Sequence, residues 1–360
     1  MKRFGCLSAL FALLFLLCAC SGGQADNTPP GGQTDNTPPG GQTESPDAPP
    51  ESAPPSGADA PPVSITLSAD EHPELDFGAV NGERAIWDFA VVGGEVCILQ
   101  RDGSVLRYSQ DGALTETYRL NVYEQGLTAS RIAFSGETLY LLDGHNNAIL
   151  TAEQSQVTHV SRLSFTDIGM VTNFYAQENG MLVMTFADIE GAYTAEVDPS
   201  GADVKIVGEK QSGYLICENT TYLPAIAGGG GGADRVDVAV YRSGQLLESF
   251  GIGSAEKSRI MAGLSIYGIS GEDWFGLLHE FVVDEKDPPQ EQYVQTAVRF
   301  NTKEGRIKTS ESAFAGDVVI RVSKSDSYCL CFSENALTIK PIAQYFSDWA
   351  EGDTYVLTHD

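Results

Sequence analysis

Beyond its first twenty residues this 360-residue chain has no long hydrophobic run, and it is poor in positive charge. Lys and Arg number 22 against 49 Asp and Glu, which gives a net charge of −27 at neutral pH. A surface of that sign repels nucleic acid and anionic lipid head groups. The sequence therefore argues against nucleic acid as a partner, and no transmembrane helix is expected after the N-terminal segment.

Cysteine is scarce, with seven in the whole chain. Cys6, Cys18 and Cys20 belong to the N-terminal hydrophobic segment. The other four are Cys97, Cys217, Cys329 and Cys331. Four cysteines in a domain of roughly 300 residues are too few for a disulfide framework, and no histidine lies near the last two to complete a metal site. We expect all four to be small buried hydrophobic side chains.

Sequence motifs of catalytic and cofactor-binding sites are also missing. The chain has no P-loop, no GxSxG, no GxGxxG, no HExxH and no DxDxDG. Ser254 and Lys257 match SxxK in spacing, but its companion motifs are absent. No cofactor and no metal are therefore expected, and the chain is expected not to be an enzyme. An active site whose residues converge from distant segments would escape such a search.

The N-terminus has the features of an export signal. Lys2 and Arg3 precede an uncharged run, Phe4–Ala19, that is mostly Leu, Ala and Phe. The run is shorter than the roughly 20 residues of a membrane-spanning helix, and it fits the hydrophobic region of a cleavable signal. It ends in Leu17-Cys18-Ala19-Cys20.

These last four residues resemble the lipobox of bacterial lipoproteins, in which a branched apolar residue and two small ones precede a cysteine. The resemblance implies that a signal peptide, residues 1–19, is cleaved off and that Cys20 receives a diacylglyceryl group. Cleavage would take the net charge from −27 to −29. Two acyl chains hold a membrane stably, so the protein is expected on the outer face of the cell membrane. The alternative is an ordinary signal, or an uncleaved anchor, with an accidental cysteine.

A linker follows, so that residues 20–62 comprise the lipidated cysteine and a Pro- and Gly-rich tract. Residues 21–62 hold eleven of the seventeen prolines, six acidic residues, no Lys or Arg and no aromatic residue. GGQADNTPP at Gly22–Pro30 recurs as GGQTDNTPP at Gly31–Pro39. Without apolar side chains to bury, the tract cannot offset the entropy of ordering itself, and we expect a disordered tether.

From Val63 the pattern changes to short segments rich in β-branched and aromatic residues, separated by turn dipeptides such as Asp102-Gly103 and Asp111-Gly112. The first group comprises Ile86–Val92, Val96–Arg101, Ser104–Tyr108 and Ala113–Leu120. The second comprises Ala129–Phe134, Thr138–Leu142, Ala148–Ala152 and Gln156–Leu163. Each group predicts a four-stranded antiparallel meander.

These groups repeat along the chain. The glycine of the first turn falls at Gly94, Gly136 and Gly180, a spacing of 42 and then 44 residues. Six such units predict an all-β fold, a six-bladed β-propeller over residues 63–360. The period and turn chemistry resemble the propeller domains attached to many bacterial lipoproteins. A tandem of β-sandwiches is the alternative.

The ends of this domain raise two further expectations. A propeller closes its ring by pairing strands from both termini in one blade, and Val63–Ser68 and Thr354–Thr358 are the strand-like ends available. Between the sixth unit and the C-terminus, Ile342–Ala350 is predicted to form a short helix that presents Tyr345, Phe346 and Trp349 on one face.

Strand order also predicts a functional face. In a four-stranded blade the turns alternate between the two faces of the disc, so all turns between second and third strands share one face. The two longest insertions predicted within blades are both of this kind, Gly228–Gly232 and Glu280–Gln292, in adjacent blades. Loops on a rigid scaffold often carry binding residues.

We therefore predict a binding face, made acidic by its loops. Its candidate residues are Gly228, Gly230, Gly232, His279, Asp284, Glu285, Asp287, Asp143 and His145. Concentrated carboxylates would attract cations or a basic partner. The turn at Asp143 is rich in oxygen donors, although an ordinary hairpin turn selects the same residue types. Acidic loops that only solvate an acidic protein are the alternative for the whole face.

The function predicted from these features is that of a non-catalytic binding or interaction module, with an unknown protein, glycan or small molecule as ligand. One alternative is a carbohydrate-active hydrolase or lyase whose carboxylates surround the central channel. Asp88 and Arg131 are polar candidates on inner strands, and carboxyl groups about 5 to 9 Å apart would favour the enzyme. Another alternative is an assembly scaffold for a membrane complex, marked by an exposed apolar patch.

Overall fold

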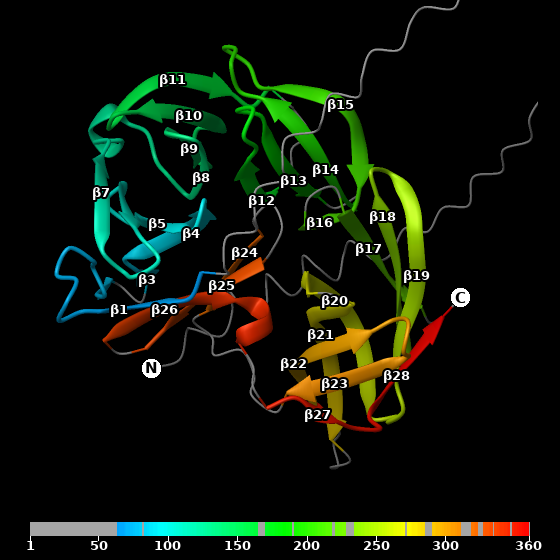
Figure 1. The fold of residues 1–360 in the computed structure, drawn as a ribbon. Coiled ribbons are helices and arrows are strands. Elements are labelled where there is room, and N and C mark those ends of the chain that lie inside the picture. Colours follow the sequence, from blue (N-terminus) through cyan, green and yellow to red (C-terminus); the bar gives the residue numbers. More distant parts are fainter. Residues whose placement is uncertain are drawn as a thin grey trace, which may run out of the picture.

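Six antiparallel sheets, each built on four strands and two of them extended by a fifth, surround a common axis and form a β-propeller (Figure 1). The computed structural model describes residues 63–80, 83–164, 170–188, 191–217, 220–227, 234–270, 272–284, 290–310, 318–322, 327–333, 335–345 and 348–359. The prediction of an all-β propeller with six blades within residues 63–360 is confirmed. The signal peptide, Cys20 and the linker lie outside the described residues. Within them, no helix is long and apolar enough to cross a membrane.

The first three blades follow one another in chain order. Blade one holds β4 (Ile86–Val92), β5 (Glu95–Gln100), β6 (Ser104–Tyr108) and β7 (Leu114–Arg119). Blade two holds β8 (Arg131–Ser135), β9 (Thr138–Asp143), β10 (Ala148–Glu153) and β11 (Gln156–Arg162). Blade three holds β12 (Met170–Ala176), β13 (Leu182–Asp188), β14 (Gly191–Asp198) and β15 (Lys205–Ser212). Turn glycines permit these tight hairpins: Gly94 and Gly180 have φ of 87° and 81°, values that favour glycine.

The other three blades depart from this pattern: strand lengths are unequal in blades four and five, and blade six takes one strand from the start of the domain. Blade four holds β16 (Tyr214–Cys217), β17 (Thr220–Ala227), β18 (Arg235–Arg242) and β19 (Gln245–Ser254). Blade five holds β20 (Arg259–Ser270), β21 (Asp273–Asp284), β22 (Gln290–Asn301) and β23 (Arg306–Ser310). Blade six holds β24 (Val318–Val322), β25 (Ser327–Phe332), β26 (Ala336–Pro341) and β1 (Ile65–Ser68). Outside the blades lie a small hairpin of β2 (Ala79–Val80) and β3 (Glu83–Arg84) and a 3-10 turn, η1 (Tyr123–Gln125).

The N-terminal strand closes the ring, as predicted. β1 pairs antiparallel with β26 from Ile65 opposite Ile339 to Ser68 opposite Ala336. Its inward-facing side chains, Ile65 and Leu67, are buried. The outermost strand of the last blade therefore comes from the start of the domain, and the two ends of the propeller are joined by a ladder of backbone hydrogen bonds.

The C-terminal strand does not take part in this closure, so that half of the prediction was wrong. β28 (Tyr355–His359) pairs with β19 and adds a fifth strand to blade four. On the way, β27 (Ala350–Glu351) adds a fifth strand to blade five by pairing with β23. Since β1 already completes blade six, the C-terminal segment covers the open edges of the two preceding blades. An uncovered edge would expose unpaired backbone groups.

The predicted helix at Ile342–Ala350 was also wrong. In the described part of this segment only η2 (Ile342–Gln344), a single 3-10 turn, forms, and the chain is extended again at β27 (Ala350–Glu351). Tyr345 and Trp349 instead pack against blade five, where the Trp349 ring meets Phe275 at a centroid distance of 6.1 Å. The spacing of these aromatic residues had indicated one face of a helix. Their rings are instead held by tertiary contacts with blade five, which do not require helical backbone. Phe346 lies outside the described residues.

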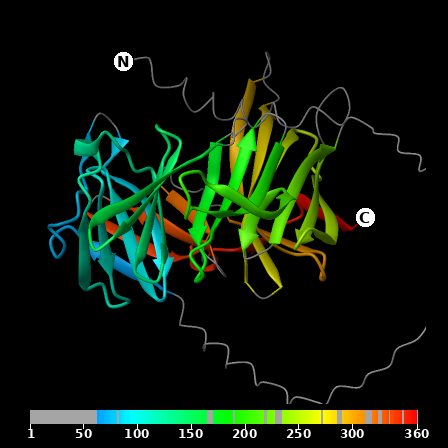
Figure 2. The same cartoon turned by 90° about the horizontal axis from the view of Figure 1, so that it is seen from above.

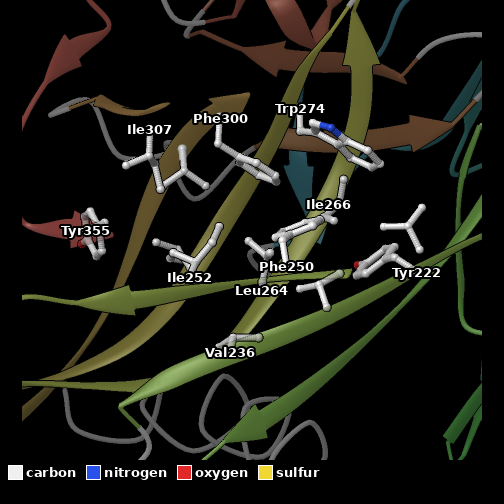
Figure 3. Close-up of a cluster of buried hydrophobic side chains, with 14 of the residues drawn as sticks. Tyr222, Val236, Phe250, Ile252, Leu264, Ile266, Trp274, Phe300, Ile307 and Tyr355 are labelled. Atoms are coloured by element: carbon white, nitrogen blue, oxygen red, sulfur yellow. The ribbon is translucent and has the colours of Figure 1, made fainter. Parts of the chain in front are cut away.

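Hydrophobic layers between neighbouring blades form the core. The largest such layer in the described chain joins blades four and five, where the Phe250 ring packs on Trp274 and Phe300 with centroid distances of 6.0 and 5.3 Å (Figure 3). The expectation for the cysteines holds for Cys97 and Cys329, which are buried thiols without a disulfide. Burial raises the pKa of Cys97 to about 12, so it stays protonated and packs as a small apolar group.

Candidate binding face

The two insertions that the sequence singled out leave the propeller on the same face. One joins β17 to β18, and the other joins β21 to β22, so both connect the second and third strands of adjacent blades. Gly228, Gly230, Gly232, Glu285 and Asp287 lie outside the described residues. Asp284 is described only as the last residue of β21. The face itself is thus defined by the strand ends that lead into these connections.

The second insertion is largely strand. β20, β21 and β22 have 12 residues each, and their pairing continues to Asp284 opposite Gln290. Residues 279–284 and 290–295, which we call the arm, therefore extend blade five beyond its neighbours (Figure 2). The Phe281-Val282-Val283 segment explains the difference, because β-branched and aromatic residues favour continued pairing over a loop.

His279 lies at the base of the arm inside a polar cluster. Its Nε2 is 2.8 Å from Ser265 Oγ, and its Nδ1 is 2.6 Å from the Tyr293 hydroxyl. Gln295 completes the group, with its amide nitrogen 3.4 Å from His279 Nδ1. Burial lowers the pKa of His279 to about 4. The ring is therefore neutral at pH 7, with one nitrogen donating and the other accepting a hydrogen bond.

Aromatic rings flank this histidine. The Tyr293 ring stacks on His279 with a centroid distance of 6.1 Å and meets Phe281 at 5.6 Å. Tyr293 keeps 40% of its surface exposed. We call Ser265, His279, Phe281, Tyr293 and Gln295 the His279 patch. It combines an exposed ring with the edge of a neutral imidazole and a carboxamide.

The Ser265–His279 pair has the spacing of a nucleophile and its base, but its surroundings do not suit catalysis. In a catalytic triad a carboxylate orients the histidine and stabilises its protonated form. Here Tyr293 occupies that place. A histidine whose pKa is about 4 is also a weak base at neutral pH. The arrangement favours recognition through hydrogen bonds over proton abstraction.

Glu280 faces the other side of the arm and has a structural role. It is fully buried, and its Oε2 accepts hydrogen bonds from Arg259 Nη1 at 3.1 Å and Tyr355 OH at 2.7 Å. Thr296 Oγ1 donates to the same oxygen at 3.2 Å. Because Tyr355 begins β28, this network fastens the C-terminal strand to blade five.

The turn at Asp143 uses its carboxylate internally. Asp143 is buried, and its two oxygens accept hydrogen bonds from the backbone and side chains of Thr128 and Asn146 and from the His145 backbone. Burial acts to raise the pKa of Asp143, but these hydrogen bonds outweigh it and hold the pKa below its ordinary value. The carboxylate thus stabilises its own hairpin, while the His145 side chain is exposed beside it. No cluster of three or more potential metal ligands occurs in the described chain.

A second polar site lies on the axis. Asp88 of β4 is buried, and its Oδ1 accepts a hydrogen bond from Arg321 Nε of β24 while its Oδ2 accepts one from the Ile132 amide of β8 at 2.9 Å. The sequence had marked Asp88 and Arg131 as polar residues of inner strands but had no signal for Arg321, which is 233 residues from Asp88. Asp88 is the one carboxylate on the six inner strands as the structure describes them. The described inner strands therefore offer no pair of carboxylates.

Comparisons with known proteins find only weak similarities. No protein-family model and no curated protein matches the chain. Virginiamycin B lyase from Staphylococcus aureus aligns at 11% identity over 77% of this chain and 98% of its own, with a TM-score of 0.37. BamB from Moraxella catarrhalis aligns at 12% identity over 77% and 91%, with a TM-score of 0.36. The WD40 β-propeller domain of Doa1 aligns at 12% identity over 80% and 99%, with a TM-score of 0.35. The class defined here is a six-bladed β-propeller, and similarities this weak carry no activity over to it.

Proposed function

We propose that this chain is a lipid-anchored extracytoplasmic binding protein without catalytic activity, and that it binds its ligand on the face that carries the arm. The observation that carries the proposal is the His279 patch. Closing a propeller requires four strands per blade, and the arm extends two strands of blade five, β21 and β22, beyond that need. The extension holds an exposed tyrosine in a fixed orientation.

The geometry of the patch supports binding of an uncharged surface. The Tyr293 hydroxyl contacts His279, so the ring is held with its face partly open to solvent. Rigid aromatic rings contribute large contact area at low entropic cost and are common anchors of binding sites. The Gln295 carboxamide can pair with hydroxyl or amide groups, while His279, whose two ring nitrogens are bonded within the patch, holds the Tyr293 hydroxyl in place. A glycan or a peptide with an apolar face fits this chemistry.

The N-terminal features support the proposed location outside the cell membrane. The lipobox-like Leu17–Cys20 would supply the anchor, and the Pro-rich tract that follows would act as a tether. A domain held outside the cell on such a tether can reach a cell-wall polymer or a partner protein. Scaffolding of a membrane complex has less support, since the most exposed large apolar residues in the described chain, Leu246 and Val356, do not adjoin: β19 and β28 are paired, but Val356 lies opposite Gly253, seven residues from Leu246.

The test uses a matched pair of tyrosines. The full-length chain is screened against arrayed cell-wall oligosaccharides and arrayed peptides, and the same arrays are then probed with Tyr293→Ala and Tyr123→Ala. Both tyrosines are about equally exposed, at 40% and 41%, but Tyr123 lies in the 3-10 turn η1, outside the patch. We expect Tyr293→Ala to weaken binding at least ~10-fold, the effect of losing an aromatic anchor, and Tyr123→Ala to leave it unchanged.

A second variant shortens Gly228–Gly232 to two residues and checks whether the neighbouring loop contributes to the same face.

The outcome for Tyr293→Ala decides the proposed site. Ligands that bind wild type and Tyr293→Ala equally well would contradict it. Weakened binding with retained circular dichroism would support it, because the fold is then intact.

A further inference from the structure

A cavity of about 210 Å³ lies between blade three and the first strand of blade four. Its walls include Val183, Glu196 and Val207, which pair across β13, β14 and β15 in one row. Leu215 of β16 lines it from blade four. Protein interiors are close-packed and contain few voids larger than a water molecule. A space of this size can hold several waters or one small organic molecule.

A bulge in β15 explains why the space is open. Thr194 pairs with Gln211 and Glu196 pairs with Val207, so one residue of β14 lies opposite three of β15. Gly208, the first of these three, has a φ of 71°, a value that favours glycine and permits the bulge. The extra residues prevent the outermost strand from following β14 closely.

The side chains on this face of blade three are small or polar. In the described chain, the buried hydrophobic residues that contact one another here are Tyr175, Val183 and Leu215, a much smaller layer than the one between blades four and five. Thr185 and Thr194 are buried on the same face of the sheet, with their hydroxyl oxygens 2.9 Å apart. The contact between these two blades is therefore thin and partly polar.

The polar groups that line the cavity lack a positively charged partner. Gln211 Oε1 is buried and has no hydrogen-bond partner in the part of the chain that the structure describes. Glu196 and Glu209 add two carboxylates, and the described lining residues include no Lys, Arg or His. The Lys210 ammonium is turned to the other face of the sheet, 4.3 Å from the centre of the Tyr193 ring. A buried acceptor without a donor costs free energy, which a donor bound in the cavity would offset.

We propose that this cavity binds a small primary amine, with the ammonium group held by the Glu196 carboxylate and the Gln211 carbonyl oxygen and the carbon skeleton packed on the apolar part of the wall. A primary ammonium has three N–H donors and no acceptor, which matches carboxylates and an unpaired carbonyl oxygen. Hydrogen bonds from an ammonium to a carboxylate are among the stronger ones in proteins. The net charge of −27 also attracts cations to the domain. None of these residues belongs to the His279 patch, so the site is independent of the proposed binding face.

The experiment is isothermal titration calorimetry of the full-length protein with two primary amines, glucosamine and putrescine. Glucose and 1,4-butanediol have matching shapes without the ammonium group. An ionic strength of ~0.15 M screens attraction between distant surface charges. We expect saturable binding of at least one amine and of neither neutral compound. Tighter binding of glucosamine assigns an amino sugar, and tighter binding of putrescine assigns a chain amine.

Three variants locate the site. Glu196→Gln keeps the shape of the side chain and removes its charge, and it should weaken the Kd at least ~10-fold. Glu153→Gln makes the same change at an exposed position of β10 in blade two and should leave the Kd unchanged. Val207→Trp adds a large ring at a partly exposed position of the wall and should abolish binding by filling the cavity. Circular dichroism checks that each variant is folded.

Absence of saturable heat with both amines would overturn the proposal. Amine binding that Glu196→Gln and Val207→Trp leave unchanged would also overturn it, because the ammonium would then bind elsewhere on the acidic surface. If Val207→Trp does not fold, the comparison of Glu196→Gln with Glu153→Gln still decides the site. Equal binding of the amines and the neutral compounds would show that hydroxyl groups suffice, which would overturn the assigned ligand class.

Discussion

His279 illustrates how the surroundings of a single side chain determine its charge and its use. Ser265, Tyr293 and Gln295 satisfy its ring nitrogens, and the protein interior removes most of its water. Because burial disfavours the imidazolium, the ring stays neutral far below its ordinary pKa. A neutral ring can therefore hold the Tyr293 hydroxyl without placing a positive charge in the patch.

This burial predicts a pH dependence of stability. The pKa of His279 is lowered from 6.5 to about 4 in the folded protein, so between those values the unfolded state binds more protons. The free energy of unfolding should therefore fall as pH drops from 6.5 to about 4, by up to about 3 kcal/mol, and then level off for this group. Urea unfolding at several pH values measures it. His279→Gln should lack this portion of the slope, whereas His145→Gln, at an exposed position, should keep it. Identical slopes in wild type and His279→Gln would contradict the assignment.

Individual strands differ in what they contribute to the propeller. β1 closes the ring, β28 covers the edge of blade four, and the arm extends blade five. The first two stabilise the molecule, and both are formed by segments far in sequence from their partners. Their roles can be separated by substitutions on each strand.

β1 should be essential for stability. Leu67 is fully buried between β26 and blade one, and Leu67→Ala should lower the free energy of unfolding by about 2–5 kcal/mol through the cavity it leaves. Ser64→Ala, at an exposed neighbouring position, should change it by less than ~0.5 kcal/mol. Deletion of Val63–Ser68 should cost several kcal/mol and promote aggregation, because it exposes the β26 edge. An unchanged urea midpoint after the deletion would mean that β1 does not close the ring.

Tyr355 should hold β28 in place through Glu280. Tyr355→Phe removes the hydroxyl that donates to the buried Glu280 carboxylate at 2.7 Å, and a loss of about 1–3 kcal/mol is expected. Hydrogen exchange of β19 and β28 should accelerate in this variant. Val356→Ala changes a half-exposed residue of the same strand and should leave exchange near the wild-type rate. Equal exchange in both variants would show that the network is dispensable.

For the whole molecule, we expect an acidic propeller displayed outside the cell. The net charge of −27 favours solubility and repels anionic surfaces, so we expect any membrane association to come from the N-terminus. The anchor prediction is therefore central to where the protein acts.

Cys20 should carry the lipid. Cys20→Ser should leave the protein unprocessed or release it into the medium, whereas Cys18→Ser keeps a small residue at its position and should leave anchoring intact. Cell fractionation together with intact-mass measurement distinguishes these outcomes. A mature protein that begins at an unmodified Cys20 would contradict the prediction.

Much of the fold could be predicted because its signals are short-range. Turn glycines such as Gly94 and alternating strand residues act within a few positions, so the sequence indicated six meanders and an N-terminal closing strand. The charged residues of Glu280–Gln292 had indicated a turn, so the sequence predicted a loop there. The strand preference of Phe281–Val283 proved stronger, and pairing continues to Asp284 opposite Gln290. The pairing of Tyr293 with His279 had no sequence signal, since it depends on a register 14 residues apart.

By itself, the sequence determined the propeller class, the number of blades and the candidate face, because local backbone preferences and strand order suffice for these. Tertiary structure alone decided the partner of β28 and the contact between Asp88 and Arg321. These depend on which residues meet across the ring, and loop closure between positions more than a hundred residues apart leaves no trace in local composition. The physical reason is that short-range sterics and turn chemistry shape each blade, whereas burial and charge pairing act only after the ring has closed.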